Sequence, residues 1–362
     1  MRQSFIIGLT LLVSAAFVSC THEVLNEKPT THIIRIQAEG QDTRTQIDGT
    51  SSLWTEGDRL LVYQSYYPDK VQTTQLVQKQ EITGAGTMID GGQTMDFTVQ
   101  FDYVDPSSVA PEYGYGDHKF KYQAAYPGER AYFDPPKEDD ADDFGRLVVP
   151  LLNRQSPTNS SFDPNADILT SRQVYLPEQP SILSLAFKRQ TALGQMTLKG
   201  LPLGAKVYNV AFVTGIGEDF IGPNAFVIDL SEPNHAGSWV YDDNYVTSHD
   251  DLDDYFDGWF YIWMEMPDGW TVSVGSSGAT EVMTSFMCCP FSLGQNYDFS
   301  VFFIEVYTQE MIEDETTGDS QLKRVYYSKR IELNSNRELV FTAGDATIFS
   351  VDMSQADRYV QG

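Results

Sequence analysis

Apolar and polar side chains alternate without interruption from residue 95 to residue 103 of this chain. The apolar set is Met95, Phe97, Val99, Phe101 and Tyr103. Successive side chains of a β-strand point to opposite faces of a sheet, so the pattern predicts a strand with one buried and one solvent-facing side. The same alternation recurs at 120–126, 183–187 and 325–333, which predicts strands in both halves of the chain.

Two further runs, at 259–266 and 301–307, are nearly all apolar and rich in aromatic and β-branched residues. Such runs are typical of central strands in a β-sandwich. Short turn signals such as Asp90-Gly91-Gly92 separate the predicted strands, whereas long amphipathic helical patterns are missing. We therefore expect an all-β fold built of antiparallel sandwiches rather than of alternating strands and helices.

The N-terminus has the layout of a bacterial signal peptide. Arg2 precedes an uncharged apolar run that ends at Val18 and is too short for a permanent membrane span, which needs about 20 residues. A small residue and Cys20 follow, as in a bacterial lipobox. We predict a signal peptide at 1–19, acylation of Cys20 and a lipidated linker at 20–29, and hence a protein held at the outer membrane surface by its lipid. The alternative is an ordinary signal peptide with a nearby cysteine.

Charge and length limit the classes of function and the number of domains. The chain carries 51 acidic and 24 basic residues, a net charge of −27, which repels phosphate backbones and argues against nucleic-acid binding. A hydrophobic content of 41% is enough for real cores, so the acidity decorates folded domains. The polar, proline-punctuated stretch 153–182 is the best boundary, and we predict domains at 30–176 and 177–362.

Signatures of catalysis and metal binding are missing from the sequence. It has no GxSxG, HExxH or P-loop motif, and its five histidines lack metal-ligand spacing. We expect no enzymatic activity, no cofactor and no metal site, although a pair of glycosidase carboxylates is defined only in space and stays open. The acidic stretches 138–143 and 242–254 lack calcium-loop spacing and are interpreted as solvated loops. Adjacent Cys288 and Cys289 are interpreted as buried apolar residues, since sequence neighbours rarely form a disulfide.

Five fragments carry a resemblance to a known family. In chain order they are TRTQIDGTSSLWTEGDRLLVY from Thr43, YQAAYPG from Tyr122, the segment from Gln155 to Leu169 that ends in ADIL, LSLAFKRQTALGQMTLKGLP from Leu183, and ELVFTAGDATIFSVDM from Glu338. Together they resemble the fimbrillin-like family of lipoprotein pilins made by anaerobic gut and oral bacteria. The chain departs from that pattern at Arg189-Gln190, where the family commonly has a histidine.

The resemblance implies two tandem transthyretin-like β-sandwich domains and a structural role in a cell-surface fimbria. The chain would be a stalk, anchor or tip subunit that supports adhesion. Its partners would be other fimbrial subunits, the membrane through its lipid, and a host or bacterial surface receptor.

The resemblance also implies a mode of assembly. In this family, removal of an N-terminal strand after an arginine exposes a groove that an extended segment of a partner fills. Here the strand would be HIIRIQA at 32–38 and the candidate cleavage site Arg44, with Arg35 a weaker alternative. The competing interpretation is that this segment stays in place as an ordinary edge strand.

The alternative function is that of a surface glycan-binding lipoprotein in a nutrient-uptake system. Aromatic rings can stack on sugars, and Trp239 and Trp270 stand beside predicted turns where they would be exposed. Trp259 and Trp263 are predicted to lie in the core, and Trp54 is predicted to cover one end of a sandwich.

Overall fold

The structure is a computed structural model of the 362-residue chain. It describes residues 30–40, 54, 56–66, 76–83, 88–89, 94–110, 117–135, 145–158, 161–214, 224–230, 237–240, 260–294, 300–313, 317–334 and 337–361. Regular structure in these ranges consists of β-strands and two short 3-10 turns, η2 (Pro106–Ser108) and η3 (Pro164–Ala166). The predicted all-β fold class is therefore confirmed.

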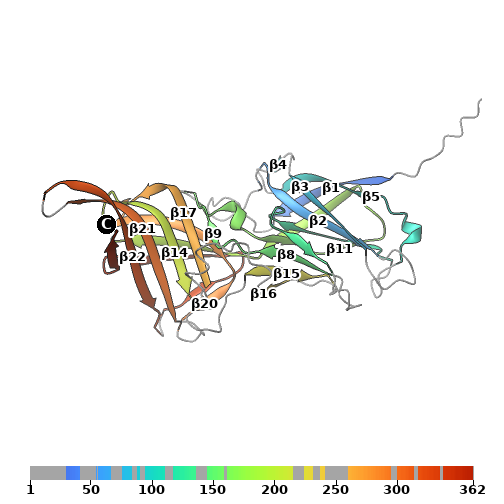
Figure 1. Cartoon of the computed structure of the whole chain (residues 1–362). Helices are drawn as coiled ribbons and strands as arrows, with labels where there is room; N and C mark the ends of the chain where they lie inside the picture. Colours follow the sequence, from blue (N-terminus) through green and yellow to red (C-terminus); the bar gives the residue numbers. More distant parts are fainter. Residues whose placement is uncertain are drawn as a thin grey trace, which may run out of the picture.

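A nine-stranded sheet forms one end of the molecule (Figure 1). Its order is β3-β2-β6-β10-β12-β1-β5-β4, and β11 also pairs with β6. The strands are β1 (Thr31–Gly40), β2 (Arg59–Tyr66), β3 (Leu76–Thr83), β4 (Met88–Ile89), β5 (Thr94–Asp102), β6 (Phe120–Tyr126), β10 (Leu169–Ser171), β11 (Val174–Leu176) and β12 (Ile182–Arg189). The predicted alternation is confirmed in β5, where Met95, Phe97, Val99 and Phe101 are buried.

A second layer of four strands packs on the other face of this sheet. Its order is β16-β15-β8-β7, from β7 (Tyr132–Asp134), β8 (Arg146–Pro150), β15 (Ala225–Asp229) and β16 (Ser238–Val240). Leu61 and Ala125 of the first sheet share a buried cluster with Val149 and Ile228 of this layer. The layer explains why β6 is buried at every position rather than at alternate ones.

Two sheets sandwich the largest core of the molecule. One has the order β25-β22-β21-β14-β17-β9 and the other β18-β19-β13-β24, and the pair β20-β23 forms a separate two-stranded sheet whose Leu293 and Phe341 belong to the same core. The strands are β9 (Arg154–Gln155), β13 (Ala192–Lys199), β14 (Lys206–Thr214), β17 (Phe260–Thr271), β18 (Ser273–Val274), β19 (Thr280–Cys288), β20 (Phe291–Leu293), β21 (Val301–Glu313), β22 (Ser320–Glu332), β23 (Leu339–Phe341), β24 (Ala346–Asp352) and β25 (Asp357–Val360).

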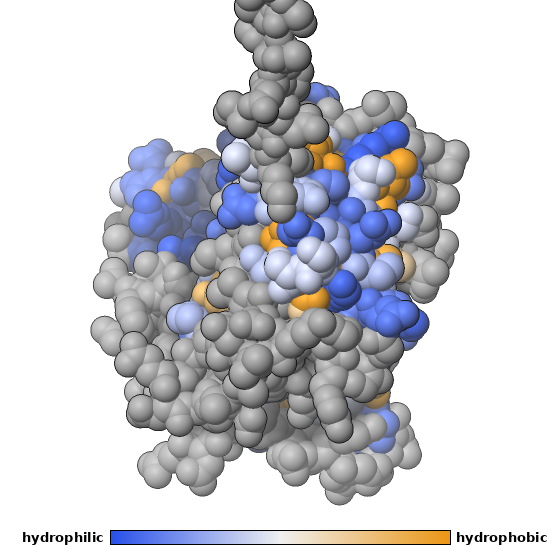
Figure 2. All heavy atoms as spheres, turned by 90° about the vertical axis from the view of Figure 1, so that its right-hand side faces the viewer, coloured by the Kyte–Doolittle hydropathy of each residue, from blue (hydrophilic) through white to orange (hydrophobic). Residues whose placement is uncertain are grey.

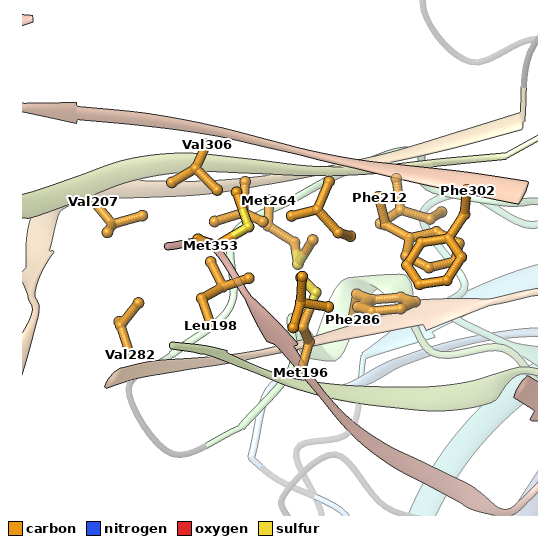
Figure 3. Packing of buried hydrophobic residues seen from close by; sticks show 14 of the residues in the cluster. Met196, Leu198, Val207, Phe212, Met264, Val282, Phe286, Phe302, Val306 and Met353 are labelled. Atoms are coloured by element: carbon orange, nitrogen blue, oxygen red, sulfur yellow. The ribbon is translucent and has the colours of Figure 1, made fainter. Parts of the chain in front are cut away.

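Stacked phenylalanines fill one side of this core, as Figure 3 shows. The ring of Phe212 lies 5.2 Å from that of Phe286 and 5.3 Å from that of Phe302, centroid to centroid. Cys288 and Cys289 are buried free thiols at the edge of the same cluster, as predicted. Burial raises the pKa of Cys289 to about 12, so this thiol is unreactive at neutral pH.

A buried ion pair joins the nine-stranded sheet to the segment that enters the core sandwich. Asp167 accepts hydrogen bonds from Arg189 at 2.7 to 3.0 Å and from the Thr191 hydroxyl at 2.6 Å. Nearby, the fully buried Gln155 amide bonds both the carbonyl and the N–H of Met287, at 2.7 and 2.9 Å. These contacts bring segments far apart in sequence into one rigid junction.

The strand pairing bears on the predicted domain boundary. Residue 177 falls between β11 and β12. Both strands belong to the nine-stranded sheet, since β11 pairs with β6 and β12 pairs with β1 and β10. In addition, β15, which lies in the second half of the sequence, pairs with β8, which lies in the first half. The sheets therefore exchange segments across the expected division, and the description as two tandem transthyretin-like domains stays a prediction.

Candidate functional site: the first strand

The first strand occupies an interior position in its sheet. β1 pairs antiparallel with β5 from Thr31, opposite Asp102, to Glu39, opposite Thr94, and parallel with β12 from Arg35, opposite Ile182, onward. The interpretation of this segment as an ordinary edge strand is therefore wrong. The reason is long-range: β12 supplies its second partner, and paired residues such as Gln37 and Ser184 stand 147 positions apart in sequence.

One face of β1 is part of the core. Ile34, Ile36 and Ala38 have no exposed surface, whereas Ile33 on the other face is 59% exposed. Ile36 lies opposite Phe97 of β5 and Leu183 of β12, so its side chain is covered from both neighbours. Burying each isoleucine contributes about 1.5–3 kcal/mol, so the apolar face alone gives this strand a strong preference for its groove.

Polar contacts fix the register of β1 at its start. The His32 ring is 2.8 Å from the carbonyl oxygen of Pro180, and the Arg35 guanidinium forms an ion pair with Asp96. The N–H of Arg35 also donates to the carbonyl of Ser181 at 3.0 Å. A register shift of one residue would turn Ile34 and Ile36 to solvent and break these contacts, so the strand has one register.

Taken together, the geometry is that of a strand seated in a two-sided groove. Without β1, β5 and β12 would each present an unpaired edge, and the core residues around Ile36 would lose their cover. Seen from this end, the described surface is mainly hydrophilic, and its hydrophobic residues form small separate groups (Figure 2). The apolar groove is thus hidden while β1 is in place.

Two predicted site residues lie outside the described residues. These are Cys20, the predicted lipidation site, and Arg44, the candidate cleavage site, which comes four positions after Gly40 at the end of β1. The acidic stretches 138–143 and 242–254 and Trp259 fall outside them as well. Arg35, the weaker cleavage candidate, lies inside β1 with its backbone paired on both sides.

The tryptophans proposed as glycan contacts are partly buried. Trp239 donates from Nε1 to the carbonyl of Gln190 at 3.2 Å and packs edge-on against Phe226, and Trp270 packs against the core sandwich. The expectation that both are exposed is therefore wrong. Trp54 is 2% exposed and makes edge-to-face contacts with Phe97, so its structural role is confirmed.

No group of three or more His, Cys, Asp or Glu in the described part of the chain could hold a metal ion. None of the helical segments in the described ranges is long and apolar enough to cross a membrane.

No family model matches the sequence, and no curated protein matches it either. Among solved structures, the chain is similar to a candidate cell adhesion protein of Bacteroides uniformis, with a TM-score of 0.42, 11% identity and coverage of 90% of this chain and 98% of that one. It is also similar to a fimbrial protein of Bacteroides ovatus, with a TM-score of 0.33, 11% identity and coverage of 89% and 49%.

A third similar structure is the fimbrial anchor protein Mfa2 of Porphyromonas gingivalis, with a TM-score of 0.30, 9% identity and coverage of 83% of each chain.

Proposed function

We propose that this chain is a structural subunit of a cell-surface fimbria, exported as a lipoprotein and joined to its neighbours by exchange of β1. The observation that carries the proposal is the place of β1: it is the first strand among the described residues, yet it lies between β5 and β12. Its departure would leave a gap between β5 and β12, and that gap has the length and the two open edges that another extended segment needs.

Cleavage after Arg44 would separate β1 from the rest of the chain. An extended segment of a neighbouring subunit would then pair with the free edges of β5 and β12. Its apolar side chains would replace the core contacts of Ile34 and Ile36. Since both backbone pairing and burial are recovered, the joined subunits should dissociate very slowly. Lipid on Cys20 would hold the precursor at the outer membrane until cleavage.

The proposal is tested by two arginine variants in the producing bacterium. Arg44→Ala should keep β1 attached, and the ladder of subunit polymers that resists mild SDS should disappear from immunoblots. Arg35→Ala is the matched control: it removes the other candidate site within the same strand and should leave the ladder unchanged. A normal ladder from Arg44→Ala would contradict the proposal, and loss only in Arg35→Ala would move the cut into the strand.

Lipidation is tested separately in the same strain. Cys20→Ala should abolish acyl labelling and either release the protein from membranes or leave its precursor uncleaved. Continued acyl labelling of this variant would contradict the assignment of Cys20.

A further inference from the structure

A row of aromatic side chains crosses the six-stranded sheet of the second half of the molecule. Tyr307 of β21, Tyr326 of β22 and Tyr359 of β25 stand opposite one another in the strand register. Their ring centroids are 4.9 Å apart between the first two and 5.8 Å between the last two. Trp263 of β17 continues the row, 5.3 Å from Tyr307.

The row lies on the outer face of the sheet. Val306 and Val325, the neighbours of Tyr307 and Tyr326 in sequence, belong to the core on the opposite face. Tyr307 and Tyr326 are half-buried, and Tyr359 is 56% exposed. The row therefore runs from a buried cluster on this face, which contains Trp263 and has Tyr307 packed against it, to the exposed ring of Tyr359.

A hollow of about 540 Å³ opens beside this row. The side chains that matter for its chemistry are Tyr208, Asn209, Tyr307, Gln309, Arg324 and Gln361. A β-bulge creates it: the pairing of β14 with both neighbours shifts between Val207 and Asn209, so Tyr208 has no opposite residue on β17 or β21. The Tyr208 hydroxyl is anchored on the Gln309 side-chain oxygen at 3.2 Å.

The chemistry of the lining suits a pyranose ring. Tyr208 and Tyr307 give the hollow aromatic surface that can contact the apolar C–H side of a sugar, while the amides of Asn209, Gln309 and Gln361 offer donors and acceptors to its hydroxyls. Arg324 adds a planar donor group, and the described lining contains no carboxylate. A concave site with a few convergent polar groups beside aromatic walls is the usual form of a small-ligand site.

Charge narrows the class of sugar. The chain carries a net charge of −27, which opposes the approach of a long acidic polymer. Neutral glycans experience no such repulsion, and the single cation of the lining can donate hydrogen bonds to neutral hydroxyls.

We propose that this hollow and the adjoining tyrosine row form a binding site for a neutral glycan. Tyr208 and Tyr307 would cover one sugar unit in the hollow, and Tyr326 and Tyr359 would support the next units along the row. The site lies at the end of the molecule away from β1 (Figure 1), so it does not depend on strand exchange.

Affinity electrophoresis tests the site with the chain produced from residue 21 onward, in native gels cast with amylopectin, galactomannan, xyloglucan or, as an acidic polymer, polygalacturonate. We expect retardation in at least one neutral gel. Tyr208→Ala and Tyr307→Ala should each weaken the dissociation constant derived from retardation about ten-fold, since each removes one stacked ring. Tyr307→Phe should retain binding because the ring remains.

One control and one further site variant keep the test decisive. Tyr103→Ala changes a half-buried tyrosine in the other half of the molecule and should bind as the unmodified chain does. Arg324→Ala removes the cation that lines the hollow, at an exposed strand position outside any core, and should also weaken retardation. Absence of retardation in every neutral gel, equal retardation of all variants, or retardation by polygalacturonate alone would overturn the proposal, whatever the outcome for fimbrial assembly.

Discussion

At the scale of single residues, the buried Asp167–Arg189 ion pair ties the nine-stranded sheet to the segment that enters the core sandwich. Arg189-Gln190 stood out in the sequence only as a departure from the fimbrillin-like pattern. The structure gives Arg189 a carboxylate partner 22 positions earlier, Asp167, and places the Arg189 guanidinium over the Phe162 ring. The alternation that identifies a strand says which face a side chain takes, but not which distant charge meets it.

We predict that Asp167→Ala lowers the free energy of unfolding by about 3–5 kcal/mol, because it leaves a buried guanidinium without its carboxylate. Urea unfolding followed by tryptophan fluorescence measures the change. The matched control is Glu332→Ala, which removes the partner of Arg330 in a pair whose side chains are 54% and 65% exposed. That change should stay within about 0.5 kcal/mol. Similar losses from both variants would contradict this account of the junction.

The Glu305 carboxyl should make stability depend on pH. It lies on the outer face of the sheet, accepts a hydrogen bond from the Tyr326 hydroxyl at 2.8 Å, and burial raises its pKa. The folded state then binds this proton more tightly than the unfolded state does. The stabilisation is therefore present below the unfolded pKa and is lost as pH rises through the folded pKa.

Glu305→Gln tests that sign. The amide cannot ionise, so the variant should gain stability relative to the unmodified chain at pH 7 and lose that advantage at pH 4. Thermal unfolding at both values gives the difference. An advantage that is larger at pH 4 would show that the carboxylate is stabilising when charged.

At the scale of elements, the sequence predicts strands well and their neighbours poorly. The alternation in β5 is found as predicted because one of its faces is buried and the other polar. β6 departs from its pattern because the second layer covers its other face, where the Lys121 ammonium donates to the Leu230 carbonyl at 2.9 Å. The interior place of β1 was missed because its parallel partner, β12, is distant in sequence.

The groove around β1 yields a prediction at this scale. Ile36→Ala should lower the free energy of unfolding by about 2–5 kcal/mol, since it leaves a cavity between β5 and β12. Ile33→Ala alters the exposed face of the same strand and should change it by no more than about 0.5 kcal/mol. Equal effects in urea unfolding would mean that β1 does not sit in this groove in solution.

At the scale of the whole molecule, the hydrophobic content of 41% predicts buried cores despite the strong acidity, and the structure contains such hydrophobic cores. Within the proline-punctuated stretch, residues 161–182 carry strands and buried side chains such as Phe162. Turn-forming residues mark where the chain changes direction, which happens between strands of one sheet as well as between domains.

Cutting the chain at the predicted boundary should therefore destroy the first half. A fragment of residues 30–176 lacks β12 and β15, the partners of β1 and β8. We expect it to show no cooperative thermal unfolding by circular dichroism, while the chain produced from residue 21 onward does. A cooperative transition in the fragment would restore the boundary near residue 177.

The most direct test of strand exchange is the N-terminal sequence of subunits taken from purified filaments. If β1 is removed and replaced by a segment of a neighbour, the polymerised chains begin at Thr45, and peptides from 31–44 are missing from them by mass spectrometry. If polymerised chains begin at lipidated Cys20 with β1 still attached, this subunit does not assemble by exchange of its first strand.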